Sequence, residues 1–145
     1  MRILISACLL GARCRYDGAS KPQPWIAALA KRHTLVPVCP EQLGGLPTPR
    51  PPAERRGDRV VTREGADVTA QYRRGAEEAL ALCRLLGCGA ALLKERSPSC
   101  GRGEIYDGTF SGTLTPGDGV TAALLEASGV AVYGESRLRE LLEGD

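Results

Sequence analysis

The stretch VPVCPEQLGGLPTPRPPAE, at residues 36–54, changes abruptly from a strand-like apolar run to loop chemistry. The run ends at Cys39, an acid follows at Glu41, and several prolines then stiffen the chain by fixing φ. Two further stretches, ILISACLLGARCRYDG and ALLKERSPSCGRGE, place Cys8 and Cys100 shortly after an apolar run in the same way. The repeated layout indicates that these cysteines occupy equivalent positions, each in a loop that follows a strand.

The rest of the chain alternates between short apolar runs and segments of helical periodicity, which predicts an α/β fold with a mostly parallel sheet of about four strands. We expect strands at residues 2–7, 34–38, 90–94 and 130–133. We expect helices at residues 24–32, 68–86, 118–128 and 136–143. The length of 145 residues fits one domain, residues 1–145, with its own core.

Single residues predict several element boundaries. Trp25 is expected to face inward from the first helix, and Pro37 predicts that the second strand lies at an edge of the sheet or kinks near its end. Asp67 and Asp118 are expected to cap the helices that follow them.

Two segments lie outside the alternation of strands and helices. The connection at residues 40–66 is long, which is uncommon in a compact domain unless the loop is functional, and RVVT at residues 59–62 predicts a small extra strand within it. The sequence IYDGTF predicts a small hairpin, because Asp107-Gly108 is a strong two-residue turn signal.

The composition argues against several classes of protein. Hydrophobic residues make up 43% of the chain and charged residues 25%, which argues against disorder, and a net charge of +2 does not favour nucleic acid or an anionic membrane as a partner. No apolar stretch is long enough to span a bilayer, and the N-terminal run lacks the basic region of a signal peptide. We therefore expect a cytoplasmic protein whose six cysteines are metal ligands, catalysts or buried thiols rather than disulfides.

Cys8, Cys39 and Cys100 each follow a predicted parallel strand. Because ligands bind beyond the carboxyl ends of such strands, we expect the three thiolates to converge on one site. The alternative is that each is a small buried hydrophobe, and we favour that interpretation for Cys83 and Cys88. Three thiolates can hold a zinc ion with an open fourth position or a cubane iron–sulfur cluster with one open iron, and the spacing does not choose between them.

Other side chains near these cysteines are candidates for catalysis and substrate binding. Glu41 is best placed to move protons, although an exposed loop acid or a helix cap has an equal claim on sequence alone. Ser97 could donate a hydrogen bond to a substrate, or it could form the turn that shapes its loop. The candidate substrate-binding residues are Arg50, Tyr16 and Ser99, with Asp17 and Lys21 as further wall residues and Cys14 as a reserve ligand or neighbour of the site.

His33 is the only histidine, so an H-E-x-x-H zinc site is impossible. It is expected at the end of a helix, at the edge of the sheet far from the cysteines, as a surface or C-cap residue. The glycine patterns of dinucleotide-binding loops and P-loops are also absent.

The segments SACLLG, CRYDG, VCPEQLGGLPTPRPPAE and LKERSPSCG together resemble a bacterial family, long catalogued as a domain of unknown function, whose characterised members are thiouracil desulfidases or desulfurases. The resemblance implies a Rossmann-like, three-layer single domain. It further implies a 4Fe-4S cluster held by Cys8, Cys39 and Cys100 with one iron open, and it places the catalytic acid at Glu41 and the active-site serine at Ser97.

The implied reaction converts a thiocarbonyl to a carbonyl with release of sulfide, as from 2-thiouracil to uracil, without net electron transfer. The implied partner is a small thiolated nucleobase or related thioamide; neither a membrane nor a nucleic acid is expected, and the oligomeric state is left open. Two other interpretations remain: a cluster- or metal-binding sensor without catalysis, and a metal-free enzyme with a cysteine nucleophile. The sequence has no helix-turn-helix signature or basic stripe to support a sensor. Its only histidine is badly placed to activate a cysteine nucleophile.

Overall fold

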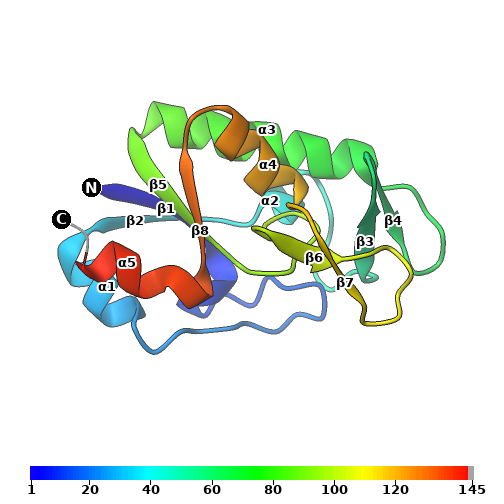
Figure 1. The fold of residues 1–145 in the computed structure, drawn as a ribbon, viewed down its shortest axis with the longest axis horizontal. Coiled ribbons are helices and arrows are strands. Elements are labelled where there is room, and N and C mark those ends of the chain that lie inside the picture. The colour runs from blue at the N-terminus through cyan, green and yellow to red at the C-terminus, as the bar shows by residue number, and fades with distance from the viewer. Residues whose placement is uncertain (144–145) are drawn as a thin grey trace.

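The computed structural model describes residues 1–143 and is built on a parallel sheet with the strand order β2-β1-β5-β8 (Figure 1). The strands are β1 (Arg2–Ser6), β2 (Thr34–Val38), β5 (Cys88–Leu93) and β8 (Ala131–Gly134). Each lies within about two residues of its predicted position, as boundary predictions commonly do. β2 is an edge strand, as Pro37 predicted, because an edge position leaves one side of the strand without a hydrogen-bonded neighbour.

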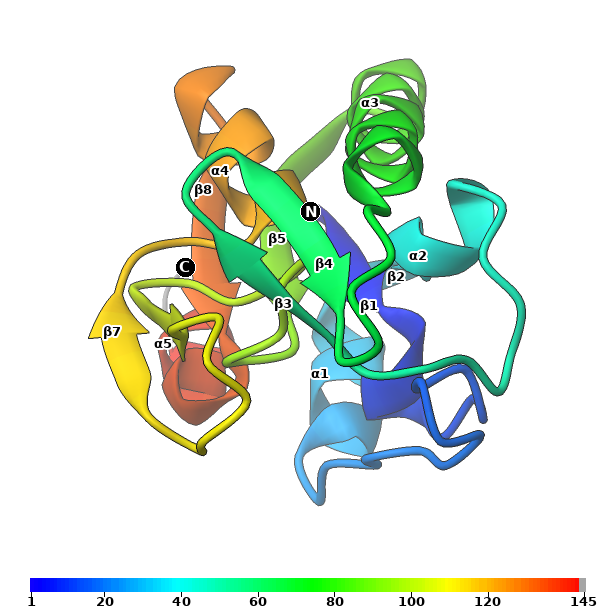
Figure 2. The same ribbon diagram turned by 90° about the vertical axis from the view of Figure 1, so that its right-hand side faces the viewer.

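Helices cover both faces of this sheet, which confirms the expected Rossmann-like α/β fold (Figure 2). One face carries α3 (Thr69–Leu85) and α4 (Val120–Ala127). The other carries α1 (Ile26–Arg32) and α5 (Leu138–Glu143). Two short 3-10 helices, η1 (Ala7–Leu10) and η2 (Glu135–Arg137), follow β1 and β8. None of the helices within residues 1–143 has both the length and the apolar character that crossing a membrane requires.

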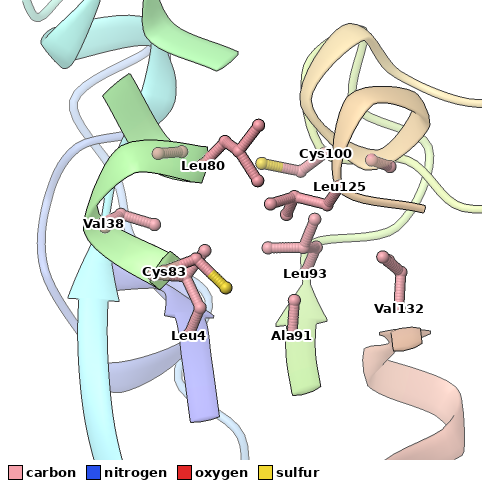
Figure 3. Close-up of a cluster of buried hydrophobic side chains, with 11 residues drawn as sticks. Leu4, Val38, Leu80, Cys83, Ala91, Leu93, Cys100, Leu125 and Val132 are labelled. Atoms are coloured by element: carbon pink, nitrogen blue, oxygen red, sulfur yellow. The ribbon is translucent and has the colours of Figure 1, made fainter. Parts of the chain in front are cut away.

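The central strands contribute to two cores because successive side chains of a strand point to opposite faces. Leu4 of β1 packs toward α3 and α4, whereas Ile3 packs toward α1 and α5. Figure 3 shows the first of these cores, in which the sulfur of Cys100 is directed toward Leu80 and lies beside Leu125. Strands that are buried on both faces read as continuous apolar runs, which is why the sequence located them well.

Two antiparallel ribbons are added to this framework. The long connection after β2 contains α2 (Pro40–Leu43) and a ribbon of β3 (Ala53–Arg56) and β4 (Arg59–Thr62), of which only β4 was predicted. The second ribbon pairs β6 (Glu104–Tyr106) with β7 (Leu114–Pro116). Its turn spans residues 107–113, so the predicted two-residue turn at Asp107-Gly108 is wrong. The Gly108 N–H is instead bonded to Glu54 of the first ribbon, 2.9 Å away.

The predicted helix caps differ from the observed ones. Asp67 lies one residue before the N-cap of α3 and accepts a hydrogen bond from the Thr69 N–H at 2.9 Å. Its carboxylate therefore still satisfies a backbone donor in the first turn of the helix. Asp118 does not cap α4, whose N-cap is Gly119. The Asp118 carboxylate instead accepts the Gly103 N–H at 2.6 Å, because the chain before β6 turns back toward it.

The prediction for the residue at the N-terminal end of α1 is wrong, and the prediction for the residue at its C-terminal end is confirmed. Trp25 occupies the N-cap position and is 46% exposed, beneath the guanidinium of Arg139, so the expectation that it faces the core is wrong. His33 is the C-cap residue, as expected, and its N–H donates to the Leu29 carbonyl at 3.0 Å.

Candidate active site and metal centre

The carboxyl ends of three neighbouring strands, β2, β1 and β5, open into a cavity of about 530 Å³. The chain passes from β1 to β2 through α1 on one face and from β2 to β5 through α3 on the other. The direction of winding therefore reverses between β1 and β5, which is the position where open parallel sheets bind their ligands. Cys8, Cys39 and Cys100 all line this cavity, one after each of the three strands.

A short helix or a turn positions each of these thiols. Cys8 lies in η1, Cys39 is the N-cap residue of α2, and the Cys100 N–H donates to the Ser97 hydroxyl oxygen at 3.0 Å. Burial raises the pKa of Cys100 to about 12, and the hydrogen bond with Cys14 together with burial raises the pKa of Cys39. Without a cation these two thiols keep their protons, and a metal that binds them must displace those protons.

Cys14 is a fourth thiol in the same cavity. It is buried and within hydrogen-bonding reach of both Cys39 and Cys8. The hydrogen bond with Cys39 lowers the pKa of Cys14, but the bond with Cys8 and burial outweigh it, so the pKa is raised. Cys88 lies at the opposite end of β5, and Cys83 faces the core from α3, so neither lines the cavity.

The donor set fits an iron–sulfur cluster better than a single zinc ion. Within residues 1–143, no three His, Cys, Asp or Glu side chains are arranged to hold one metal ion. A zinc ion requires its ligands to converge on one atom, whereas each cysteine of a cubane cluster binds a different iron, so the sulfurs can stand further apart. The thiols of Cys8 and Cys100, which are buried, and of Cys39, which is half-buried, surround one cavity with no histidine among its lining residues, and they match the second case.

Glu41 lies in the first turn of α2 and lines the cavity with a side chain that is 17% exposed. Arg50 donates from Nη2 to Oε2 at 3.0 Å, and the Tyr72 hydroxyl donates to Oε1. Burial and the adjacent Glu41 charge raise the pKa of Tyr72, so its hydroxyl remains a donor. Both carboxylate oxygens are therefore held in place from within the protein.

A glycine contact between α2 and α3 brings Glu41 to Tyr72. A Cβ on Gly75 would lie 1.9 Å from the Pro40 carbonyl oxygen, and a Cβ on Gly44 would lie 2.0 Å from a carbonyl oxygen of α3. Only glycine permits so close an approach of two backbones. The short helix is thereby seated directly on the side of α3 that carries the Tyr72 ring.

Arg50, a predicted substrate-binding residue, lies behind Glu41 and is not among the residues that line the cavity. It is 8% exposed, and besides Glu41 it donates to the Cys14 carbonyl at 2.9 Å. Burial lowers the pKa of Arg50, but the Glu41 charge outweighs this effect and the pKa is raised. Arg50 therefore joins Glu41 to the loop that carries Cys14.

The other predicted residues are divided between the cavity and its surroundings. Ser97 lines the cavity, and its hydroxyl oxygen accepts the N–H groups of Ser99 and Cys100, so it also forms the expected turn. Tyr16 lines the cavity at its exposed side. Ser99 is 1% exposed and hydrogen-bonded to Thr121 at 2.8 Å, away from the cavity.

Several residues of the cavity were not singled out from the sequence. One is Tyr72, because nothing local in the sequence marks its hydroxyl as a partner of Glu41. Lys94 follows β5 and donates from Nζ to Glu135 at 3.0 Å. The ribbons add Glu54 and Phe110 to the lining.

The fold is that of a Rossmann-like α/β domain with a thiol-lined cavity at the position where such sheets bind their ligands. Residues 3–137 match the model of the 2-thiouracil desulfurase family, and the chain belongs to that family. This confirms the family and the enzyme class that the cysteine-containing motifs indicated.

Two similar proteins extend the comparison. A solved structure of the [4Fe-4S]-dependent thiouracil desulfidase TudS is 54% identical in sequence, with a TM-score of 0.92, and the match covers 97% of this chain and 94% of that one. A protein of Bacillus subtilis (strain 168), the uncharacterized protein YbbK, is 45% identical over 150 residues, covering 97% of this chain and 99% of its own length. The likeness therefore extends over nearly the whole chain in both cases.

Proposed function

We propose that the chain is a 4Fe-4S-dependent desulfidase that converts the thiocarbonyl of a small thiolated heterocycle, such as 2-thiouracil, to a carbonyl. The observation that carries the proposal is the arrangement of Cys8, Cys39 and Cys100, from three neighbouring strands, around one cavity with Glu41. The likeness to TudS supports the cofactor and the substrate class. The reaction balances as thiocarbonyl plus water to carbonyl plus hydrogen sulfide, with no net oxidation or reduction.

Cys8, Cys39 and Cys100 are the proposed ligands, with Cys14 as their neighbour rather than a ligand. A cubane cluster held by three cysteines supplies a thiophilic iron, free of protein ligands, that acts as a Lewis acid on the thiocarbonyl sulfur. Six cysteines without a disulfide suit a reducing compartment, so the proposal places the enzyme in the cytoplasm.

Glu41 is the proposed catalytic acid–base. Because Arg50 and Tyr72 hold one oxygen each, the carboxylate has a fixed orientation at the cavity wall. From there it can accept a proton from the attacking water and return a proton to the departing sulfide. The Ser97 oxygen accepts two backbone N–H groups, so its own hydroxyl proton is left to donate to the substrate.

The test is sulfide release from 2-thiouracil by the anaerobically reconstituted protein, with Glu41→Gln beside wild type. We expect Glu41→Gln to keep the visible absorption of the cluster while kcat falls by about 10²- to 10⁴-fold, the usual contribution of general acid–base catalysis. Glu126→Gln is the control, because that carboxylate forms a surface pair with Arg102 outside the cavity.

Thermal melts would show whether Glu41→Gln stays folded, since the change leaves Arg50 without its carboxylate. Equal activity of Glu41→Gln and wild type would contradict the catalytic role. A wild type that holds a cluster but releases no sulfide from thiolated heterocycles would favour a sensor without catalysis.

A further inference from the structure

The two antiparallel ribbons supply a part of the cavity wall that neither cluster binding nor the role of Glu41 requires. In Figure 2 the ribbon of β3 and β4 lies in front of the main sheet, with β7 of the other ribbon to its left. Glu54 of β3 and Arg63, just beyond β4, come from the first ribbon. Phe110 and Gly112 come from the 107–113 loop of the second. The wall therefore depends on how this loop lies against β3.

Hydrogen bonds attach the 107–113 loop to β3. The Glu54 Oε1 atom accepts the Gly108 N–H at 2.9 Å and the Phe110 N–H at 3.1 Å, and Arg56 donates from Nε to the Gly108 carbonyl at 2.7 Å. Gly108 has φ +93°, and a Cβ there would lie 2.4 Å from the Arg56 side chain. A glycine at this position thus lets the loop lie directly on the strand.

The attachment holds Phe110 in an unfavourable backbone conformation. Its φ is +57°, in the left-handed region that bulky residues rarely adopt. Such strain persists only where the surroundings enforce it, and it is concentrated at ligand-binding sites. Phe110 is also the only phenylalanine of the chain, and it is half-buried at the cavity wall rather than packed in either core.

Two arginines lie near the Phe110 ring. The guanidinium carbons of Arg63 and Arg56 are 5.7 and 6.0 Å from the ring centroid, within the range of cation–π attraction. Arg63 lines the cavity together with Phe110, whereas Arg56 does not. The fold thus holds an aromatic ring at the wall of a cavity proposed to receive a planar heterocycle.

We propose that Phe110 is the stacking surface for the planar ring of the substrate and thereby favours cyclic thiocarbonyl compounds over acyclic ones. This inference rests on the proposed function, because it assigns a role within the same cavity. Glu54 and Arg56 act as positioning residues that hold the loop. Stacking between a phenyl ring and a planar heterocycle contributes to binding and leaves the water attack to groups at the strand ends.

The test compares reconstituted wild type with Phe110→Leu, Phe110→Trp and the control Trp25→Leu, an aromatic residue outside the cavity that also lies beneath an arginine. For 2-thiouracil, Phe110→Leu should raise KM by about tenfold, the scale of one base–aromatic stack, with kcat changed by less than about threefold. Phe110→Trp should restore KM, Trp25→Leu should match wild type, and the cluster absorption should be equal in all four proteins.

Thiourea, a small acyclic thiocarbonyl compound, separates stacking from a general disturbance of the cavity. Its turnover should be the same in Phe110→Leu and wild type, and an equal loss for thiourea and 2-thiouracil would overturn the proposal. An unchanged KM for 2-thiouracil in Phe110→Leu would overturn it as well.

Calorimetric binding of uracil and 2-thiouracil to the same proteins distinguishes a failure of this inference from a failure of the proposed function. If wild type releases no sulfide, the proposed function fails, yet stacking is still supported when Phe110→Leu binds both rings about tenfold more weakly. Equal affinity of wild type and Phe110→Leu for both rings would contradict stacking whatever the activity.

Discussion

The strand ends and the two ribbons build the same cavity by different physical means. At the strand ends, Cys8 and Cys100 are buried: Cys8 lies in η1 directly after β1, and Cys100 lies in the turn after β5 that the Ser97 hydroxyl closes. In the ribbons, Glu54 and Phe110 are only half-buried, and hydrogen bonds between side chains and backbone hold them. A rigid sheet suits groups whose geometry decides a reaction, whereas an attached loop suits contacts that decide which ligand fits. Substitutions at the strand ends should therefore affect the cofactor or kcat, and those in the ribbons should affect KM.

The largest expected effect distinguishes the two ends of a single strand. Cys100→Ala, beyond the carboxyl end of β5, should lose the cluster absorption and reduce sulfide release to the detection limit. Cys88→Ala, at the amino end of the same strand, should keep both, because Cys88 does not line the cavity. Iron content and visible absorption after reconstitution measure the difference, and a cluster-free Cys88→Ala would show that strand position does not decide ligation.

A smaller effect is expected at α3, which carries Tyr72, the hydrogen-bond donor to Glu41. Tyr72→Phe removes the hydroxyl that donates to Glu41, so kcat should fall by about tenfold while the cluster is kept, the scale of one buried hydrogen bond to a charged group. Tyr133→Phe is the matched control, since Tyr133 lies on β8 away from the cavity. Steady-state kinetics with 2-thiouracil measure the effect. A change confined to KM would contradict this role and show that Tyr72 contributes to substrate binding, as the ribbon residues are expected to do.

The smallest effect concerns the attachment of the 107–113 loop. Glu54→Ala removes the acceptor of two loop N–H groups, and KM for 2-thiouracil should rise by roughly threefold with kcat retained, in the range of one hydrogen bond. Glu104→Ala, an exposed carboxylate on β6, is the control. If Glu54 acts through Phe110, the KM effects of Glu54→Ala and Phe110→Leu should not add in the double variant, whereas full additivity would separate them.

The sequence located the strand-end half of the cavity because the relevant signals are local. An apolar run that a cysteine closely follows predicts both a buried strand and a ligand beyond its carboxyl end, and parallel pairing then brings Cys8, Cys39 and Cys100 together. The same reasoning placed Glu41 beside Cys39 and left Cys83 in the core.

The partners of these groups were not predictable in the same way because they depend on contacts between distant segments. Tyr72 reaches Glu41 only because Gly44 and Gly75 let two helices touch. The position of Phe110 depends on a turn whose apparent two-residue signal is overridden by Glu54, 54 residues before Gly108. Local propensity identifies a turn there but not the strand on which the turn rests.

The central claim is that the ends of three neighbouring strands hold the cofactor. A crystal structure of the anaerobically reconstituted protein tests it most directly. The account predicts a 4Fe-4S cluster bonded to the sulfurs of Cys8, Cys39 and Cys100, with the fourth iron facing the Glu41 side of the cavity and Cys14 unbonded. A cluster held through Cys14 in place of one of the three, or outside this cavity, would contradict the account.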